Sequence, residues 1–127
     1  MMKEKDVLKE KERSQKVQRI ERLRKNYQFQ KIYRQGRSVA TAKTVLYFKK
    51  SRIGSCRAGI VVSKKVGKSV VRHRLKRLYR EALHSLRKYL KAGYDLVIIA
   101  RKGADKLTYW DVLADLRKLL VKGKLLW

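Results

Sequence analysis

Residues 69–90 read SVVRHRLKRLYREALHSLRKYL and show the clearest periodicity in the chain. Apolar side chains recur there at spacings of three and four residues, which is the pattern of one face of an α-helix. They are Val71, Leu75, Leu78, Tyr79, Ala82, Leu83, Leu86 and Leu90. The spacing predicts a long amphipathic helix that packs this face against the rest of the fold.

The other face of the predicted helix is basic. Residues 64–80, KKVGKSVVRHRLKRLYR, contain eight Lys or Arg and no acidic residue. At about 100° per residue, six basic side chains fall on one stripe opposite the apolar face. We call this set the basic stripe: His73, Lys76, Arg77, Arg80, His84 and Arg87.

The position of these cations along the helix is also unusual. Four of the Lys and Arg residues in 64–80 fall in the first turns of the helix, where the helix dipole favours Asp or Glu by about 0.3 to 1 kcal/mol each. These four are Arg72, Arg74, Lys76 and Arg77. A surface that only keeps a protein soluble needs neither a single sign of charge nor this placement. The segment therefore predicts an anionic ligand, and the amides that follow Gly67 are further donors suited to phosphate.

The overall charge points to the same class of ligand. The 127 residues include 36 Lys or Arg and 10 Asp or Glu, which gives a formal net charge of +26. A polyanion offsets such an excess and releases its condensed counterions on binding. Acidic membrane is the competing polyanion, but no apolar run approaches the roughly 20 residues of a membrane span, and no signal peptide is evident. We expect a cytoplasmic nucleic-acid-binding protein that does not engage a membrane.

The region before residue 69 predicts one helix and several strands. Residues 26–35 form a short amphipathic helix in this interpretation, with Asn26 as the N-cap and Gly36 just after the last turn. Residues 44–48 and 57–63 are rich in β-branched and aromatic residues and predict strands. Residues 37–41 are a further candidate strand.

Beyond the basic helix the pattern predicts one more strand and one more helix. Gly93 is expected to end the long helix, and residues 95–100, DLVIIA, predict a buried strand. A last helix is indicated by apolar residues at helical spacing: Tyr109, Val112, Leu113, Leu116 and Leu120. We assign residues 18–127 to a single domain. The mixed-charge extension 1–17 is either a helix or disordered, and the pattern does not choose between the two.

Three aromatic residues fall where they could meet on one side of the sheet. Phe29 and Tyr33 are four residues apart on the first predicted helix, and Tyr47 faces away from its strand neighbours. Such residues form a plain core more often than a stacking platform for single-stranded RNA, although Lys64 and Lys65 would suit the latter. The residues alone leave both interpretations open.

The acidic residues and the single cysteine indicate no catalytic or metal site. The five acids beyond residue 25 are scattered and form no obvious two-metal cluster. Asp111 is better explained by the N-terminal dipole of the last helix, as is Asp115. Glu81 with His84 resembles half of a di-iron motif, but no second copy exists. Cys56 has no partner for a disulfide or a paired-thiolate zinc site and is expected to be buried.

The segment VSKKVGKSVVRHRLKRLYRE, residues 62–81, resembles the RNR signature of bacterial ribonuclease P proteins. The resemblance extends over about residues 22–120, through RLRKNYQFQKIYRQGRSV near the start and YDLVIIARKGA after the helix. It implies a two-layer α/β sandwich with a small mixed sheet, in the order α-β-β-β-α-β-α. It also implies a left-handed βαβ crossover, whereas the general rule predicts a right-handed one.

The same resemblance implies the function. In that family the protein joins a catalytic RNA that cleaves precursor tRNA by Mg²⁺-assisted hydrolysis, so no catalytic residue and no protein-bound metal are expected here. The RNA is expected to bind most of the Mg²⁺. The residues implied to face the catalytic RNA are Arg72, His73, Arg74, Lys76, Arg77 and Arg80. His73 occupies a position that is usually Asn in the motif.

The family also binds the single-stranded 5′ leader of precursor tRNA in a cleft beside its first helix. The matching residues here are Phe29, Tyr33, Tyr47, Ser63, Lys64 and Lys65. The resemblance therefore favours a leader-binding cleft over a plain core for the three aromatics. The alternatives are a structural RNA-binding protein of the ribosomal kind and a nuclease that acts without RNA. The oligomeric state is not predicted.

Overall fold

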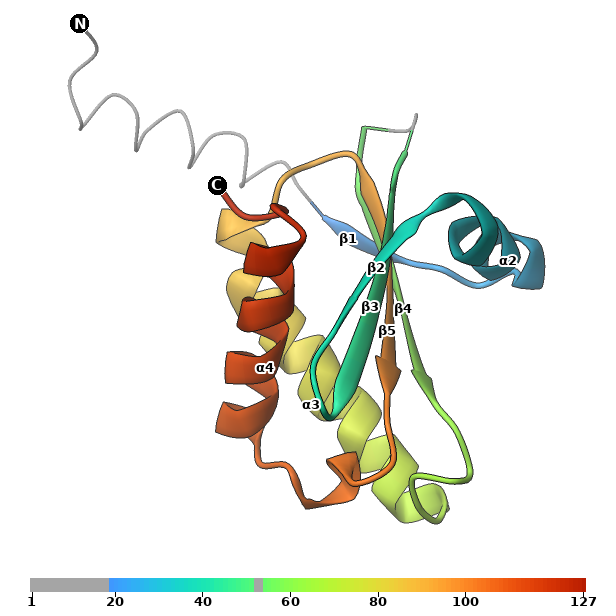
Figure 1. The fold of residues 1–127 in the computed structure, drawn as a ribbon, viewed down its shortest axis with the longest axis vertical. Helices are drawn as coiled ribbons and strands as arrows, with labels where there is room; N and C mark the ends of the chain where they lie inside the picture. Colours follow the sequence, from blue (N-terminus) through green and yellow to red (C-terminus); the bar gives the residue numbers. More distant parts are fainter. Residues whose placement is uncertain (1–18, 52–53) are drawn as a thin grey trace, which may run out of the picture.

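The centre of the structure is a mixed β-sheet, in a computed structural model that describes residues 19–51 and 54–127 (Figure 1). Its strands are β1 (Ile20–Arg22), β2 (Arg37–Ala40), β3 (Thr44–Lys50), β4 (Cys56–Val62) and β5 (Tyr94–Ala100). Their order across the sheet is β1-β4-β5-β3-β2. β1, β4 and β5 are parallel, whereas β3 is antiparallel to both β5 and β2.

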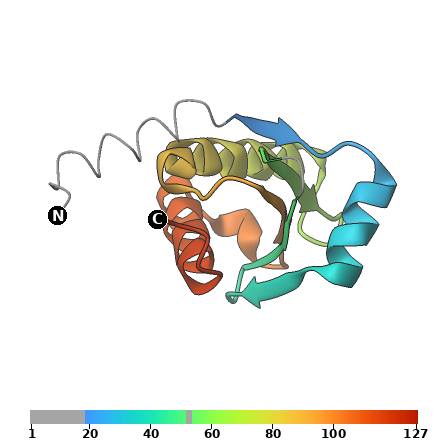
Figure 2. The same cartoon turned by 90° about the horizontal axis from the view of Figure 1, so that it is seen from above.

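Helices cover both faces of this sheet. They are α2 (Asn26–Gln35), α3 (Ser69–Leu86) and α4 (Tyr109–Lys122). Figures 1 and 2 show α2 on one face and α3 with α4 on the other. From α2 onward, the predicted order of one helix, three strands, a long helix, a strand and a last helix is confirmed. The strand β1, which precedes α2, was not predicted. The extension 1–17 lies outside the described residues.

The connection between β4 and β5 runs through α3. In Figures 1 and 2 the chain descends β4, returns upward along α3 and descends β5, while β1 and β2 mark the rear and front edges of the sheet. Since β5 lies in front of β4 and α3 lies to their left, this path is left-handed. The family resemblance, and not the general rule for crossovers, gave the correct hand.

Two helix boundaries differ from the prediction. α3 ends at Leu86 and continues as a 3₁₀ turn, η1 (Arg87–Tyr89), because Leu90 adopts an extended backbone and forms a bridge with Leu126. α2 begins after Lys25, so the prediction of Asn26 as its N-cap is wrong. The side-chain Oε1 of Gln28 instead accepts hydrogen bonds from the backbone N–H groups of Arg24 and Lys25, each 3.1 Å long.

Gly36 ends α2 as predicted, although not through a left-handed backbone. Its φ is −86°, and its N–H donates to the carbonyl of Ile32. A Cβ at this position would lie 2.5 Å from the Ile32 oxygen and 2.6 Å from that of Phe48. Glycine is needed here because α2 and β3 approach each other closely.

The larger core lies between the sheet and the pair α3 and α4. Leu46 of β3 and Ile98 of β5 are fully buried there against Leu75 of α3. The predicted burial of Cys56 is confirmed. The periodicity of residues 69–90 therefore buries the face that it predicted.

One polar pair is enclosed in this core. The hydroxyl groups of Thr44 and Tyr79 lie 2.6 Å apart, and both side chains are fully buried. Burial is the main cause that raises the pKa of Tyr79, and the hydrogen bond with Thr44 opposes it. This hydrogen bond connects the first residue of β3 to the middle of α3.

Replacing Tyr79 with phenylalanine should lower the free energy of unfolding by about 1 to 2 kcal/mol, because the buried hydroxyl of Thr44 loses its partner. The double variant Tyr79→Phe with Thr44→Val should lose less free energy of unfolding than the two single variants lose together, since neither hydroxyl then remains without a partner. Urea unfolding of the four proteins measures this coupling. Strictly additive losses would contradict the enclosed pair.

The smaller core lies under α2, on the opposite face of the sheet. Leu23, Ile32 and Val97 are buried there. Beside them, Arg57 and Asp95 form a two-pronged ion pair with N–O distances of 2.8 and 2.7 Å, in which the carboxylate is almost fully buried.

None of the helices in residues 19–51 and 54–127 combines the length and apolar character needed to cross a membrane.

Candidate nucleic-acid interface

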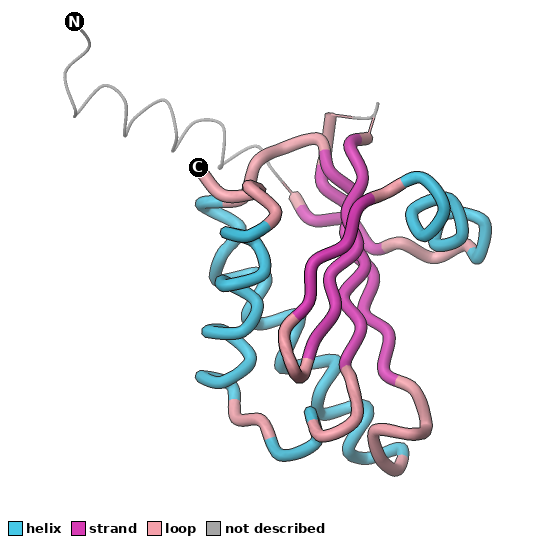
Figure 3. The backbone as a smooth tube through the Cα atoms, in the orientation of Figure 1, coloured by secondary structure: helices cyan, strands magenta, loops and turns pink. Residues whose placement is uncertain are grey.

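The basic stripe lies on the solvent side of α3, as the helical spacing predicts. His73, Arg77, Arg80 and His84 are exposed, while Lys76 is half-buried. The apolar side of the helix holds the stripe in place because it packs on the sheet. In Figure 3 the helix runs alongside the strands, so the stripe extends over much of the length of the molecule.

Two of the predicted RNA-binding arginines also hold neighbouring loops. Arg72 donates from Nη1 to the carbonyl of Gly67 over 3.1 Å. Arg74 donates to the carbonyls of Asp105 and Leu107 over 3.2 and 2.7 Å, which connects α3 to the loop before α4. Each guanidinium has five N–H donors, so both arginines keep donors for a further ligand.

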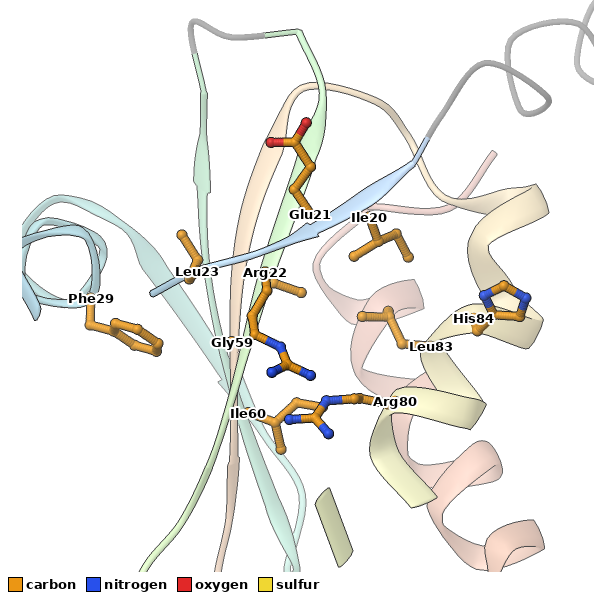
Figure 4. A pocket seen from close by; sticks show the side chains of 11 residues that line it. Ile20, Glu21, Arg22, Leu23, Phe29, Gly59, Ile60, Arg80, Leu83 and His84 are labelled. Atoms are coloured by element: carbon orange, nitrogen blue, oxygen red, sulfur yellow. The ribbon is translucent and has the colours of Figure 1, made fainter. Parts of the chain in front are cut away.

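A residue that the sequence analysis missed extends the basic surface. Arg22 of β1 points toward Arg80 of α3 (Figure 4). The pKa of Arg80 is lowered by burial and, to a smaller extent, by the charge of Arg22. The side chain of Glu21 points away from this pair (Figure 4). Two guanidinium groups thus converge with no carboxylate between them.

These two arginines belong to a hollow of about 290 Å³ where β1 ends and the edge of β4 becomes open. Phe29 of α2 lines one side of the hollow, and Arg80 with His84 of α3 lines the other (Figure 4). The hollow therefore joins the basic stripe to the side of the sheet that α2 covers.

The three predicted aromatic residues meet on that side. The rings of Tyr33 and Tyr47 pack edge to face, with centroids 5.0 Å apart and an interplanar angle of 76°. Phe29 lies directly on the sheet, because a Cβ added to Gly59 of β4 would be 2.5 Å from its ring. All three rings are half-buried and therefore reach solvent along one side. We call this set the aromatic face.

Ser63, Lys64 and Lys65 do not join the aromatic rings in one enclosed pocket. All three are exposed in the turn after β4, where the N–H of Val66 donates to the Ser63 carbonyl over 3.1 Å. Ser63 lies four positions beyond Gly59 along the strand, which is roughly 13 Å. Figure 1 shows this turn at the end of the sheet away from α2. The six predicted residues therefore do not surround one closed cleft. We call the α2 side of the sheet between the aromatic face and this turn the strip.

Burial on this face changes the chemistry of Tyr33. Its pKa is raised, first by burial and then by the neighbouring Tyr47. A phenol is protonated at neutral pH even at its ordinary pKa, and the raised pKa keeps Tyr33 a hydrogen-bond donor to a base or a phosphate at higher pH as well. Val61 and Ile99, both half-buried, pack against the same cluster and add apolar surface to the strip.

The two acidic residues of α4 have structural partners in this fold. Asp111 accepts hydrogen bonds from the N–H and hydroxyl of Thr108, which lower its pKa and cap α4. Asp115 accepts from the hydroxyl of Thr41 over 2.8 Å. Within residues 19–51 and 54–127, no three His, Cys, Asp or Glu side chains are grouped so that they could hold a metal ion.

Comparison with known proteins places this arrangement in a family. A family model described as Ribonuclease P matches residues 17–124. The chain belongs to the bacterial ribonuclease P protein family. A ribonuclease P protein component from Clostridium botulinum is 45% identical over 103 residues, covering 80% of this chain and 93% of that protein.

Solved structures of ribonuclease P proteins share the fold. The protein from Staphylococcus aureus has a TM-score of 0.79 and 35% identity, covering 85% of this chain and 99% of that one. The protein from Thermotoga maritima has a TM-score of 0.74 and 34% identity, covering 80% and 96%. As a ribonuclease P protein, the chain is a subunit of the endoribonuclease that processes the 5′ end of tRNA, and its partner in that ribonucleoprotein is RNA.

Proposed function

We propose that the basic stripe, with Arg22, binds the catalytic RNA of ribonuclease P, and that the aromatic face binds the single-stranded 5′ leader of precursor tRNA. The observation that carries this proposal is the hollow beside β1, where Phe29 and Arg80 line a common space. A strand of RNA that leaves the aromatic face there passes directly to the cations of α3.

The stripe suits a folded RNA because its side chains are basic, almost no acidic residue lies among them, and most of them are exposed. Glu81 is the one acid on α3, and it lies 3.9 Å from Arg77 in an exposed pair that is weak in water. Each phosphate that the stripe neutralises releases counterions and thereby stabilises the complex. His73 is exposed within the stripe and, when neutral, can still donate one hydrogen bond to RNA. Arg72 and Arg74 are the flanking contacts in this proposal.

The aromatic face suits single-stranded RNA. Its half-buried rings offer surfaces on which unpaired bases stack, at roughly 1 to 3 kcal/mol per base. Ser63, Lys64 and Lys65 lie farther along the same strip and would hold the phosphates of the next nucleotides. A leader in this strip would be read mainly by shape and stacking.

In this proposal the RNA subunit performs the hydrolysis and binds most of the Mg²⁺. The protein contributes by holding the precursor in position and by offsetting phosphate repulsion within the assembled RNA. This division of labour places the chain in the cytoplasm with the tRNA precursors. No side chain of the protein has to accept or donate a proton in the reaction.

Adding the purified chain to a bacterial ribonuclease P RNA at low Mg²⁺ should increase the rate of precursor tRNA cleavage, because protein cations replace part of the screening by Mg²⁺. The control is the same RNA at high Mg²⁺, where the increase should be smaller. A rate unchanged by the protein would contradict the proposal. Cleavage by the chain alone, after extensive treatment to remove RNA, would contradict the assignment of catalysis to RNA.

A further inference from the structure

A second basic hollow, of about 480 Å³, lies where α2 ends and β2 begins. Five cationic residues line it, and the lining includes no Asp or Glu. They are Arg37, Lys49, Lys50, Lys91 and Lys124. They come from four separate segments of the chain, so the fold, and not a local charge run, brings them together.

The backbone at Lys124 adds a second observation. Lys124 follows the last turn of α4 and has a φ of +57°, a left-handed value that no other residue except glycine adopts in residues 19–51 and 54–127. Its N–H donates to the carbonyl of Val121, and the next N–H, that of Leu125, donates to Leu120. Glycine is the usual residue at such a helix end. The chain therefore places a cation in the hollow at a position whose backbone favours glycine.

The hollow and the start of the basic stripe lie toward opposite edges of the sheet. Only the last residue of the stripe, Arg87, comes near the hollow in the chain, four positions before Lys91. α3 packs over β4, whereas α4 packs over β2 and β3 at the other side of the sheet. Figure 2 shows β1 and β2 at opposite edges, with α3 near the first and the end of α2 leading into the second. A ligand in the hollow is therefore reached from the β2 edge of the sheet, whereas the start of the stripe lies toward the β1 edge.

The chemistry of the lining favours a nucleic acid over a protein. Protein interfaces usually bury an apolar or aromatic centre. Here Phe48 is already almost fully buried beneath the hollow, and Tyr94 is half-buried, so little apolar surface remains for a partner. Clustered lysines without acids instead suit successive phosphates.

We propose that this hollow is a second RNA-binding site, which holds a phosphodiester segment of RNA distinct from the one on the basic stripe. This inference rests on the RNA partner of the ribonuclease P family, and it does not depend on leader binding by the aromatic face. The RNA of the ribonucleoprotein would then contact the protein at two edges of its sheet.

The first test measures binding to a bacterial ribonuclease P RNA as a function of salt. The variant Lys49→Gln, Lys50→Gln, Lys124→Gly should flatten the slope of log K against log salt by about one to three, since each lost phosphate contact removes about 0.7 to 0.9. A control variant, with Lys102, Arg117 and Lys118 changed to Gln, loses the same charge from exposed positions outside both surfaces. Equal slopes for the two variants would overturn the proposal. Glycine suits the left-handed backbone at position 124, so this substitution should leave the fold, and therefore the comparison of slopes, undisturbed.

The second test locates the RNA. Cys56 is fully buried, so an iron–EDTA probe can be attached selectively to Lys124→Cys or, on the stripe, to His73→Cys. In the assembled holoenzyme the two probes should cleave different segments of the RNA. If only the probe at 73 cleaves, or both cleave the same segment, the second site is wrong while the stripe stands. If only the probe at 124 cleaves, the stripe is wrong and the hollow stands.

Discussion

Changing Lys76, Arg77 and Arg80 together to glutamine is expected to weaken binding to ribonuclease P RNA by about 100- to 1,000-fold near physiological salt. Each contact to a phosphate contributes about 1 to 1.4 kcal/mol, and three such losses total about 3 to 4 kcal/mol. The slope of log K against log salt should also flatten by about two to three. Fluorescence anisotropy over a range of salt concentrations measures both quantities.

The matched control for this variant is again the change of Lys102, Arg117 and Lys118 to glutamine. It removes the same charge from exposed positions away from α3. Its affinity should fall much less, because general attraction is screened within about 8 Å at physiological salt. If the two variants lose affinity equally, net charge and not the geometry of α3 determines binding.

Replacing Phe29 with alanine should weaken binding of precursor tRNA to the holoenzyme by about 5- to 100-fold and leave mature tRNA nearly unchanged. The reason is that one stacked base, at roughly 1 to 3 kcal/mol, is lost only by the substrate that has a leader. The change Gly59→Ala should act in the same direction, since its Cβ would lie 2.5 Å from the Phe29 ring and displace it. Equilibrium binding of both tRNAs to each holoenzyme is the measurement.

Tyr27 provides the control on the same helix. Its ring is 64% exposed and lies under the ammonium group of Lys25, 5.9 Å from the ring centroid. Tyr27→Ala removes an aromatic ring from α2 without touching the aromatic face, so precursor binding should change little. If Phe29→Ala weakens mature and precursor tRNA alike, Phe29 is only part of the core.

The basic stripe could be predicted because helical periodicity is local. Every third or fourth residue of 69–90 determines which side of α3 is buried, and the opposite side follows from the same count. The pairing of Tyr33 with Tyr47 was open on the residues alone. It depends on α2 packing against β3, and only the family resemblance favoured it before the structure showed the two rings 5.0 Å apart.

Other features depend on contacts that leave little trace in the sequence. β1 has only three residues, too few to show alternation, and Ile20 pairs with the distant Cys56. The approach of Arg22 to Arg80 follows from that pairing and was therefore missed. The hollow at Lys124 combines four separate segments in the same way. Gly36 could be recognised as a helix end, but not as the point where α2 touches β3.

The most direct test is hydroxyl-radical footprinting of the protein in three states: free, bound to ribonuclease P RNA, and bound to that RNA with precursor tRNA. Oxidation of α3 at His73 and His84 should fall when the RNA binds. Oxidation of Phe29, Tyr33 and Tyr47 should fall further only when precursor tRNA is added. If α3 is oxidised equally in all three states, it does not face the RNA and the central claim is wrong.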